Sequence, residues 1–458
     1  MTRNVDRRQF LVQSAAAGVG LVLGGSLAGA RTVSPNAKLQ HACIGVGSMG
    51  WNDLHSFANH KRVQIVALCD VDADNLARAA QVAPDARLYA DWRELLEKED
   101  GRIDAVNVAV PDHMHFSIAW SAIEKGKHVY CQKPMCHDVA EVRALTQASV
   151  KNNVITQLGT QFASTVHERT AVLWLREGRI GKVTHAYLCS NRPGAVENYR
   201  LKGPRPPTGE PPPKNLNWEL WSGCAPLRAY VRDIYHPVKW RAWQDFGTGW
   251  SGDIGCHIFD PVWKGLGLQP PTSVCAEVQE SWKDSPERRG DTWPQGEHIT
   301  WTFPANHMIE GNELVLEWFD GEYYPPQSIR KLYSGDLKDY PAESSMLVGT
   351  EGALFIPLGA EPELLPDEKF TQVRRPNLPE RDHYHRFVEA CLGGEKTESH
   401  FAQTGPMTEA ILLGTVAIRA PGAVLRWEAR RLRIPNHPEA EQLLRRDYRK
   451  GWELPVKL

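Results

Sequence analysis

The chain has 458 residues, of which 42% are hydrophobic and 24% are charged, and its formal net charge is −2. This length is enough for two or three folded domains with sizeable cores. The nearly neutral charge argues against binding to nucleic acid or to an anionic membrane surface, so a small molecule is the expected partner.

The first thirty residues have the pattern of an export signal. A twin arginine opens the run Arg7–Leu11, and a weakly apolar, glycine- and alanine-rich stretch follows from Val12 to Ala30. A charged region, an apolar region and a small-residue end are typical of a cleaved twin-arginine signal peptide. We therefore predict export by the twin-arginine machinery to the periplasm, with cleavage near Ala30. An uncleaved membrane anchor is the alternative, although small residues make a poor anchor.

Between Leu39 and Leu158, short apolar runs alternate with amphipathic stretches. We expect strands at Ala42–Gly45, Val63–Asp70, Arg87–Tyr89, Ala105–Val110, His128–Cys131 and Val154–Leu158. Helices are expected between them, for example at Phe116–Lys125 and Val139–Asn152. Strands that are apolar throughout belong to parallel sheets covered on both faces. Residues 38–158 are therefore predicted to form a doubly wound α/β domain, which binds ligands beyond the carboxyl ends of its strands.

The first predicted strand ends in a glycine-rich turn made of Gly45, Val46, Gly47, Ser48, Met49 and Gly50. In this spacing the first glycine allows a tight turn, the second lets the backbone approach a pyrophosphate, and the third lets the helix pack on the strand. The N-terminus of the following helix attracts the negative charge. The turn therefore predicts a dinucleotide site formed by these six residues.

Asp70 lies twenty residues after Gly50, at the end of the second predicted strand. A carboxylate there accepts hydrogen bonds from the adenosine ribose and repels a 2′-phosphate, so NAD is predicted over NADP. The twin-arginine route carries folded proteins. We therefore expect NAD to be tightly bound, to leave the cytoplasm with the enzyme and to be recycled outside.

The nine cysteines are an odd number, and Cys43, Cys69, Cys131 and Cys189 fall in strand-like runs. They are expected to be buried apolar side chains and not a disulfide framework. Cys131 and Cys136 also lack the spacing of a zinc site.

Lys133 lies in the segment Gln132-Lys133-Pro134, directly after the fifth predicted strand. The nicotinamide is expected at this end of the sheet, and Pro134 restricts the backbone there. A lysine in this place can donate a hydrogen bond to a substrate hydroxyl and stabilise the charge that develops on its oxygen. An ordinary solvated lysine is the alternative.

After residue 158 the strand-like runs follow one another with turns between them. They are Val183–Ser190, Val274–Gln279, His298–Phe303, Leu314–Trp318, Ser345–Val348 and Leu354–Pro357. Helices are expected at Val166–Glu177, Ile254–Lys264, His383–Cys391 and Met407–Ala420, the last two packing back against the body. Residues 159–458 are thus predicted to form an α+β domain with a large open, mostly antiparallel sheet. The proline-rich segment 203–214 is predicted to be a rigid surface loop, with a rim over the active site as the alternative.

Asp253 and His257 lie in the glycine-rich run Gly247–His257. Residues four apart share one face of a helix, so we expect these side chains to lie together. A histidine with a near-neutral pKa suits a general base, and the carboxylate would orient it or bind a hydroxyl. A helix cap with a buried structural histidine, or a metal pair, would be the alternative. Because no third ligand is evident, no metal is predicted.

The same region is rich in groups that bind sugars. Five tryptophans fall within 33 residues: Trp218, Trp221, Trp240, Trp243 and Trp250. Indole faces stack on the C–H faces of pyranose rings, and we expect one or two of these to touch ligand while the others form core. The predicted substrate site consists of Asn191, Arg192, Trp240, Arg241, Asp253 and His257.

From about Leu39 to the C-terminus, these motifs resemble the Gfo/Idh/MocA family of glucose–fructose oxidoreductases and inositol dehydrogenases, in particular its exported bacterial members. The family's Glu-Lys-Pro motif is matched by Gln132-Lys133-Pro134, with glutamine in place of glutamate. Its Asp-x-x-x-His motif is matched by Asp253 and His257. The segment Pro111–His115 is similar to the family's cofactor loop, which implies Pro111, His115 and Gln132 as cofactor contacts.

The resemblance implies a two-domain fold and a homo-oligomer formed through the C-terminal sheet. It also implies that Lys133 and His257 handle the proton in reactions of sugars, inositols or related polyols. Three functions remain open at this point. They are a net NAD-dependent dehydrogenase or reductase, a glycoside hydrolase or lyase that works by transient oxidation and elimination, and a non-catalytic NAD-dependent binding protein. His236 and Tyr235 keep the second one open as candidate acids.

Overall fold

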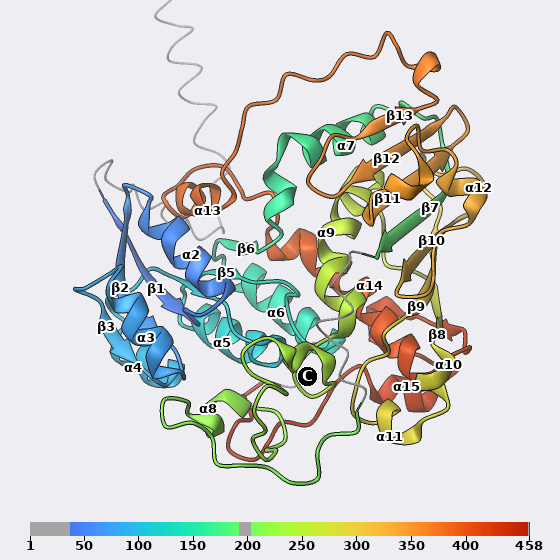
Figure 1. Ribbon diagram of the computed structural model, residues 1–458. Helices are drawn as coiled ribbons and strands as arrows, with labels where there is room; N and C mark the ends of the chain where they lie inside the picture. Colours follow the sequence, from blue (N-terminus) through green and yellow to red (C-terminus); the bar gives the residue numbers. More distant parts are fainter. Residues whose placement is uncertain (1–36, 192–202, 457) are drawn as a thin grey trace, which may run out of the picture. The chain divides into compact units, whose positions relative to one another are not determined.

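Two sheets organise the part of the chain that the computed structural model describes, which comprises residues 37–191, 203–456 and 458 (Figure 1). The predicted signal peptide with its cleavage site near Ala30 lies outside these residues, and so does Arg192. Among the described residues, no helix combines the length and the apolar character needed to cross a membrane.

The first sheet has six parallel strands in the order β3-β2-β1-β4-β5-β6. They are β1 (Leu39–Ile44), β2 (Val63–Cys69), β3 (Arg87–Tyr89), β4 (Ala105–Val108), β5 (His128–Cys131) and β6 (Thr156–Leu158). The connecting helices are α2 (Met49–Ala58), α3 (Ala73–Ala80), α4 (Trp92–Lys98), α5 (Asp112–Glu124) and α6 (Val139–Lys151). This order confirms the predicted doubly wound fold, whose crevice lies at the carboxyl ends of β1 and β4.

Helix α5 begins at Asp112, four residues before the predicted start at Phe116. Pro111, with φ −59° and ψ 149°, is the extended N-cap residue. The carboxylate of Asp112 suits the positive end of the helix dipole in the first turn. The first turn of α5 was not predicted because its buried polar residues do not follow the alternation of apolar and polar faces that marks a helix in the sequence.

The second sheet has eight strands in the order β13-β12-β11-β7-β10-β9-β8-β14. They are β7 (Val183–Ser190), β8 (Ser273–Val278), β9 (Glu297–Pro304), β10 (Glu313–Asp320), β11 (Glu343–Gly349), β12 (Ala353–Pro357), β13 (Glu363–Leu365) and β14 (Leu425–Arg426). Strands β7 and β10 are parallel and the other neighbours are antiparallel, as predicted for most of the sheet. The short strands β13 and β14 were not expected.

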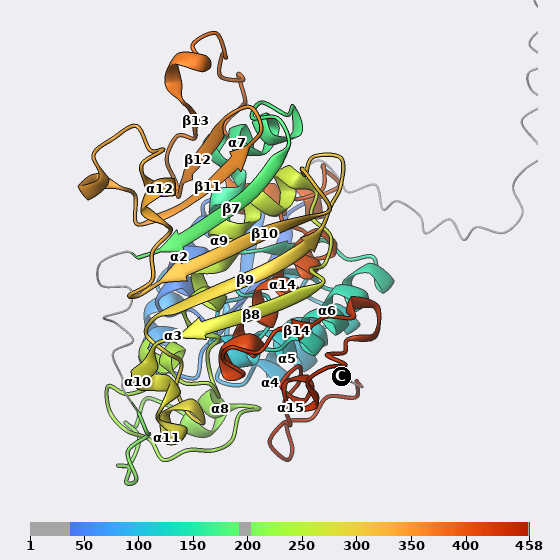
Figure 2. The same cartoon turned by 90° about the vertical axis from the view of Figure 1, so that its right-hand side faces the viewer.

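Helices α7 (Val166–Arg176), α9 (Gly249–Leu266) and α14 (Phe401–Arg419) pack on one face of this sheet (Figure 2). Both α9 and α14 begin earlier than predicted, at Gly249 and Phe401. Glycines in α9 lower helix propensity, but they also allow close packing, since a Cβ on Gly265 would lie 2.4 Å from Cδ1 of Leu175 in α7. Packing against α7 and α14 therefore stabilises a helix that is longer than its own sequence pattern predicts.

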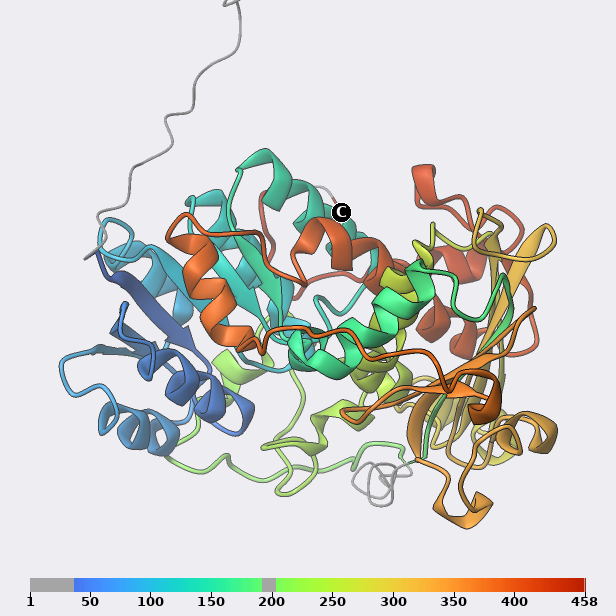
Figure 3. The same cartoon turned by 90° about the horizontal axis from the view of Figure 1, so that it is seen from above.

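Helix α13 (His383–Cys391) packs against α2, one of the helices that cover the first sheet, as expected (Figure 3). Phe387 and Val388 join the core around Leu54 and Phe57. The shorter helices are η1 (Gln161–Ser164), α8 (Trp218–Ser222), η3 (Lys239–Ala242), α10 (Glu280–Lys283), α11 (Pro286–Arg289), α12 (Gln327–Arg330), η4 (Leu337–Asp339), η5 (Asp367–Lys369), η6 (Ala429–Arg431) and α15 (Pro438–Gln442).

All nine cysteines are free thiols and seven of them are buried, which confirms their prediction as core side chains.

Candidate active site

A cavity of about 500 Å³ lies at the carboxyl ends of the parallel strands. Residues at the ends of β1, β2, β4 and β5 form one wall. The other wall comes from α8, the segment His236–Arg241 and His257 of α9. Elements that follow the first sheet in sequence thus close the crevice in which the sequence predicted a dinucleotide.

The glycine turn forms a cradle at one end of this cavity. Gly45 has φ 81°, and a Cβ there would lie 2.3 Å from the carbonyl oxygen of Ala109. A Cβ on Gly50 would lie 2.1 Å from the carbonyl oxygen of Gly45. The first turn of α2 carries no acidic side chain, so the positive end of its dipole is free to attract a pyrophosphate. Gly45, Gly47, Ser48 and Met49 line the cavity, whereas Val46 and Gly50 are outside its lining.

Asp70 lines the cavity and is held by the backbone. Its Oδ2 accepts the N–H of Val46 at 2.9 Å and its Oδ1 accepts the N–H of Asp72 at 2.9 Å. Burial raises the pKa of Asp70 above its ordinary value, and these two N–H groups oppose the shift. Each oxygen keeps capacity for a ribose hydroxyl. Residues 70–74, directly after β2, carry the three carboxylates of Asp70, Asp72 and Asp74 and no lysine or arginine, which fits NAD better than NADP.

Lys133 and Asp253 form an ion pair across the two halves of the chain. The Nζ of Lys133 donates to Oδ1 of Asp253 at 2.7 Å, and Nε of Arg241 lies 3.3 Å from its Oδ2. Burial alone would raise the pKa of Asp253, but the charges of Lys133 and Arg241 outweigh it and hold that pKa well below its usual range. Asp253 therefore stays ionised and fixes both cations at the site.

His257 follows Asp253 by one turn of α9 and lines the same cavity. Its side chain is buried, and its ring packs edge-on against Phe162 of η1 with the centroids 5.3 Å apart. The N-cap of α9 is Thr248, so Asp253 lies inside the helix and is not a cap. The structure thus brings the three side chains predicted to be catalytic, Lys133, Asp253 and His257, to one part of the molecule.

The remaining predicted residues are divided between the cavity and its support. Pro111, Gln132, Trp240 and Arg241 line the cavity. His115 is outside the lining, with its ring nitrogens 2.7 and 2.8 Å from the carbonyl oxygens of Pro134 and Val110, so it supports the loop behind Lys133.

Asn191, which directly follows β7, is also outside the lining, and its side-chain amide donates to the carbonyl oxygen of Tyr323. Of the five clustered tryptophans, Trp221 and Trp240 line the cavity, in line with the expectation that most are core. Tyr235 is buried away from the cavity, whereas His236 lines it.

Asp112 is a cavity residue that the sequence did not single out. Its Oδ2 accepts the backbone N–H and the hydroxyl of Thr248, at 3.2 and 3.0 Å. Burial and the nearby negative charge of Asp253 raise the pKa of Asp112 to about 7, although Arg241 opposes the shift. Its place directly after Pro111, beyond a parallel strand, is the signal that could have identified it.

A strap made by residues 215–217 covers the turn that follows Asp70. The N–H of Ala73 donates to the carbonyl of Asn215 at 2.8 Å, and the N–H of Asn217 donates to the carbonyl of Val71 at 2.9 Å. The side-chain amide of Asn215 donates to the carboxylates of Asp72 and Asp74 at 2.9 and 3.0 Å. The proline-rich segment 203–214, which has no helix or strand where it is described, leads directly into this strap.

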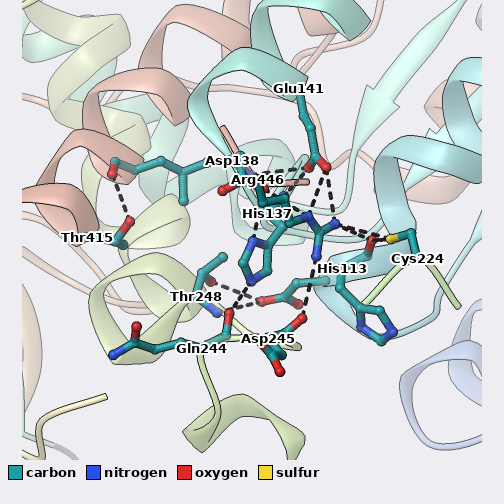
Figure 4. A network of polar contacts seen from close by, with 12 residues as sticks. His113, His137, Asp138, Glu141, Cys224, Gln244, Asp245, Thr248, Thr415 and Arg446 are labelled. Carbon is teal, nitrogen blue, oxygen red and sulfur yellow. Dashed lines mark hydrogen bonds and ion pairs between the residues drawn. The ribbon is translucent and has the colours of Figure 1, made fainter. Parts of the chain in front are cut away.

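Arg446, close to the C-terminus, is the centre of a network of polar contacts (Figure 4). Its guanidinium lies 3.0 Å from Oδ2 of Asp138 and 3.1 Å from Oε1 of Glu141, and those two side chains are 4% and 1% exposed. It also donates to the carbonyl oxygens of His113 at 2.6 Å and Asp245 at 3.4 Å. One side chain thus joins the starts of α5 and α6 to the turn that precedes α9.

Comparison with known families decides the class of this fold and site. The sequence model of an oxidoreductase family with an NAD-binding Rossmann fold matches residues 39–160. The model of that family's C-terminal alpha/beta domain matches residues 195–314, so the two together span more than half of the chain. The chain belongs to the Gfo/Idh/MocA oxidoreductase family. Its N-terminal region is the NAD-binding Rossmann domain of that family.

Named relatives of this Gfo/Idh/MocA chain are matched over part of their length. A levoglucosan dehydrogenase of Pseudarthrobacter phenanthrenivorans is 32% identical over 172 residues, which are 37% of this chain and 34% of that protein. A glycosyl hydrolase family 109 protein of Saccharopolyspora erythraea is 34% identical over 171 residues, 32% of this chain and 37% of that protein. The chain thus matches little more than a third of either relative.

A solved structure extends the likeness of the fold to most of the chain. The WlbA dehydrogenase from Bordetella pertussis, solved with NADH and UDP-GlcNAcA, superposes with a TM-score of 0.58 at 15% identity. The match covers 85% of this chain and 99% of the other. At this identity the similarity establishes the common fold alone.

Proposed function

We propose that this protein is an NAD-dependent oxidoreductase that transfers a hydride between a CH–OH group of a sugar, cyclitol or related polyol and nicotinamide. One observation carries the proposal. Lys133 and Arg241, both paired with Asp253, line the same cavity as His257, the glycine cradle and Asp70. A cation, a fixed carboxylate and a titratable base next to a dinucleotide site are the parts that alcohol oxidation needs.

Bound NAD supplies the hydride acceptor at C4 of its nicotinamide. We assign His257 the role of taking the proton from the carbinol oxygen as the hydride leaves the carbon, so that a carbonyl forms. The ammonium of Lys133 donates a hydrogen bond to that oxygen and stabilises its developing negative charge. Asp253 keeps Lys133 in place and balances its charge. In the reduction direction, His257 returns the proton to the oxygen.

Trp240 and Arg241 support a polyhydroxylated substrate. The guanidinium of Arg241 lies 4.2 Å from the ring centroid of Trp240, and both side chains line the cavity. An indole face and a charged donor combine ring stacking with hydroxyl binding. The relative named levoglucosan dehydrogenase supports the same substrate class.

A second candidate reaction is cleavage of a glycosidic bond by transient oxidation. The strap at 215–217 favours it, because its hydrogen bonds hold the turn that follows Asp70, and a nucleotide bound to a fixed turn would exchange slowly. A retained NAD suits a cycle in which oxidation acidifies the neighbouring C–H, the glycosidic C–O bond is eliminated, water adds and the hydride returns to the carbon. The relative named as a family 109 glycosyl hydrolase supports this alternative, and His236 is a candidate acid for the leaving group.

One experiment separates the two reactions. A panel of glycosides with a chromogenic leaving group is incubated with the protein in deuterated water without added NAD. Release of the leaving group, with deuterium next to the oxidised carbon, would establish cleavage. In a parallel incubation with added NAD, stoichiometric NADH with the glycosidic bond intact would establish net oxidation. Neither product with any sugar or polyol would favour the non-catalytic binding protein.

We also propose that the protein is exported by the twin-arginine machinery and works in the periplasm as a homo-oligomer. The twin arginine of Arg7 and Arg8 supports export. The face of the eight-stranded sheet opposite α9 and α14 supports self-association (Figure 2). Tyr187 and Val315, which alternate with core residues along β7 and β10, are only half-buried. Fractionation of cells with Arg7 and Arg8 changed to lysine tests the first proposal, and light scattering of the purified protein tests the second.

A further inference from the structure

Gln132 stands where the family motif has glutamate, and the structure places a carboxylate directly against it. Gln132 follows β5, lines the cavity and precedes Lys133. Its Nε2 lies 2.9 and 3.0 Å from the two carboxylate oxygens of Asp53 in α2. An ionised carboxylate only accepts hydrogen bonds, so Asp53 determines which way the Gln132 amide points.

Asp53 is completely buried and meets neutral donors. Besides Gln132, the hydroxyl of Tyr384 in α13 donates to its Oδ1 at 2.9 Å. Across the part of the chain that the structure describes, no lysine, arginine or histidine forms an ion pair with it. Burial raises the pKa of Asp53 to about 7, and the side chains of Gln132, Tyr384 and Asn107 oppose the shift.

The titratable groups that face Asp53 from neighbouring elements are thiols and phenols. They are Cys43 of β1, Tyr130 and Cys131 of β5, and Tyr384 of α13. Burial raises the pKa of each of them well above neutrality. Asp53 is therefore the member of this cluster that changes charge near neutral pH.

A second glutamine of the cavity wall belongs to the same network. Gln161 of η1 lines the cavity, and its Nε2 lies 3.0 Å from the hydroxyl of Tyr130 and 3.3 Å from that of Tyr384. Gln132 and Gln161 are thus linked behind the wall through Asp53 and Tyr384. The opposite end of the Gln132 amide is closely confined, because a Cβ on Gly159 would lie 2.5 Å from Oε1 of Gln132.

We propose that Asp53 is a positioning residue of the active site, which fixes the amides of Gln132 and Gln161 on the cavity wall and the segment that carries Lys133. The inference rests on the proposed function only in taking this cavity as the cofactor site. A protonated Asp53 has an O–H that must donate. The favourable partner is then Oε1 of Gln132, so the amide turns and Nε2 takes the confined place that Oε1 holds beside Gly159.

The test uses the full-length protein, NADH as probe and three variants: Asp53→Asn, Gln132→Glu and the double variant. Asp53→Asn should weaken NADH binding about 10-fold, the cost of one mispaired buried hydrogen bond. Gln132→Glu should weaken it at least as much, because two carboxylates then face each other. The double variant exchanges acid and amide, and it should return the NADH dissociation constant to within about threefold of the parent's.

Two further measurements separate positioning from simple stabilisation. NADH affinity of the parent should change with pH through the titration of Asp53 near pH 7, and this component should be lost in Asp53→Asn. Asp100→Asn, a surface acid paired with Lys125 and Lys127, is the matched control and should behave as the parent. If Asp53→Asn does not fold, Tyr384→Phe replaces it. The loss of that donor should move the titration to higher pH.

The inference would be overturned if Asp53→Asn lowered the melting temperature but kept the parent's NADH affinity and pH dependence. Failure of the double variant to regain affinity would overturn it as well. For Tyr384→Phe, an unmoved titration would have the same consequence. A parent protein that does not bind NADH at all would instead contradict the proposed function.

Discussion

Replacement of Arg446 by methionine should destabilise the protein and loosen the site from behind. The substitution keeps most of the side-chain volume and removes the charge that faces Asp138 and Glu141. Both carboxylates are almost fully buried, and removal of one partner from such a cluster costs about 3–5 kcal/mol. For roughly 420 folded residues, with an unfolding entropy of about 2 cal/mol/K per residue, this corresponds to a melting temperature lower by about 3–6 °C.

Arg445→Met is the matched control, because Arg445 is exposed and its side chain contacts only the carbonyl of Leu458 among the bonds described for it. Its melting temperature should stay within about 1 °C of the parent's. Differential scanning calorimetry of the three proteins at one pH measures the effect. Equal melting temperatures for Arg446→Met and Arg445→Met would show that the ion pairs of Arg446 do not stabilise the fold and would refute this reasoning.

Three further predictions concern the site. Asp70→Ala should weaken NAD binding and reduce discrimination against NADP, as measured by fluorescence titration; a parent that binds NADP more tightly than NAD would contradict the assignment. His257→Ala and Lys133→Ala should each lower turnover by about 10²–10⁴-fold with near-normal NAD binding, and parental rates in both would exclude their proposed roles. Asn215→Ala should speed dissociation of bound nucleotide several-fold in stopped-flow exchange, whereas Asn152→Ala, which removes a surface amide–carboxylate bond, should not; equal rates would exclude the strap as a retention device.

The sequence predicted those parts of the site that local chemistry determines. The glycine turn and Asp70 are specified by a short spacing between a strand and a helix, so both could be placed in advance. Lys133, Asp253 and His257 could also be selected as candidates, because each stands at a strand end or on a helix face, and their catalytic roles stay predictions. The contact between Lys133 and Asp253 joins positions 120 residues apart, and only the folded chain could reveal it.

The rest depends on distant contacts that leave no local pattern. Arg446 reaches Glu141 from 305 positions away, and its sequence neighbourhood resembles any charged tail. The strap at 215–217 pairs with the turn after Asp70 through backbone groups, which every residue carries. Helix α9 begins early because it packs against α14, although glycine disfavours helices. His115 was placed on the cofactor by resemblance, whereas in the structure it holds the carbonyl of Pro134.

The central claim is that Lys133 and His257 serve hydride transfer to an NAD bound in this cavity. Both proposed reactions begin with that step, so single-turnover reduction of bound NAD tests it most directly. The natively purified protein is saturated with NAD, mixed with each member of a panel of sugars, cyclitols and polyols, and followed by NADH fluorescence. The account predicts reduction of NAD by at least one compound, at a rate about 10²–10⁴-fold lower in His257→Ala with NAD still bound. NAD that stays oxidised across the whole panel, or equal reduction in His257→Ala, would contradict it.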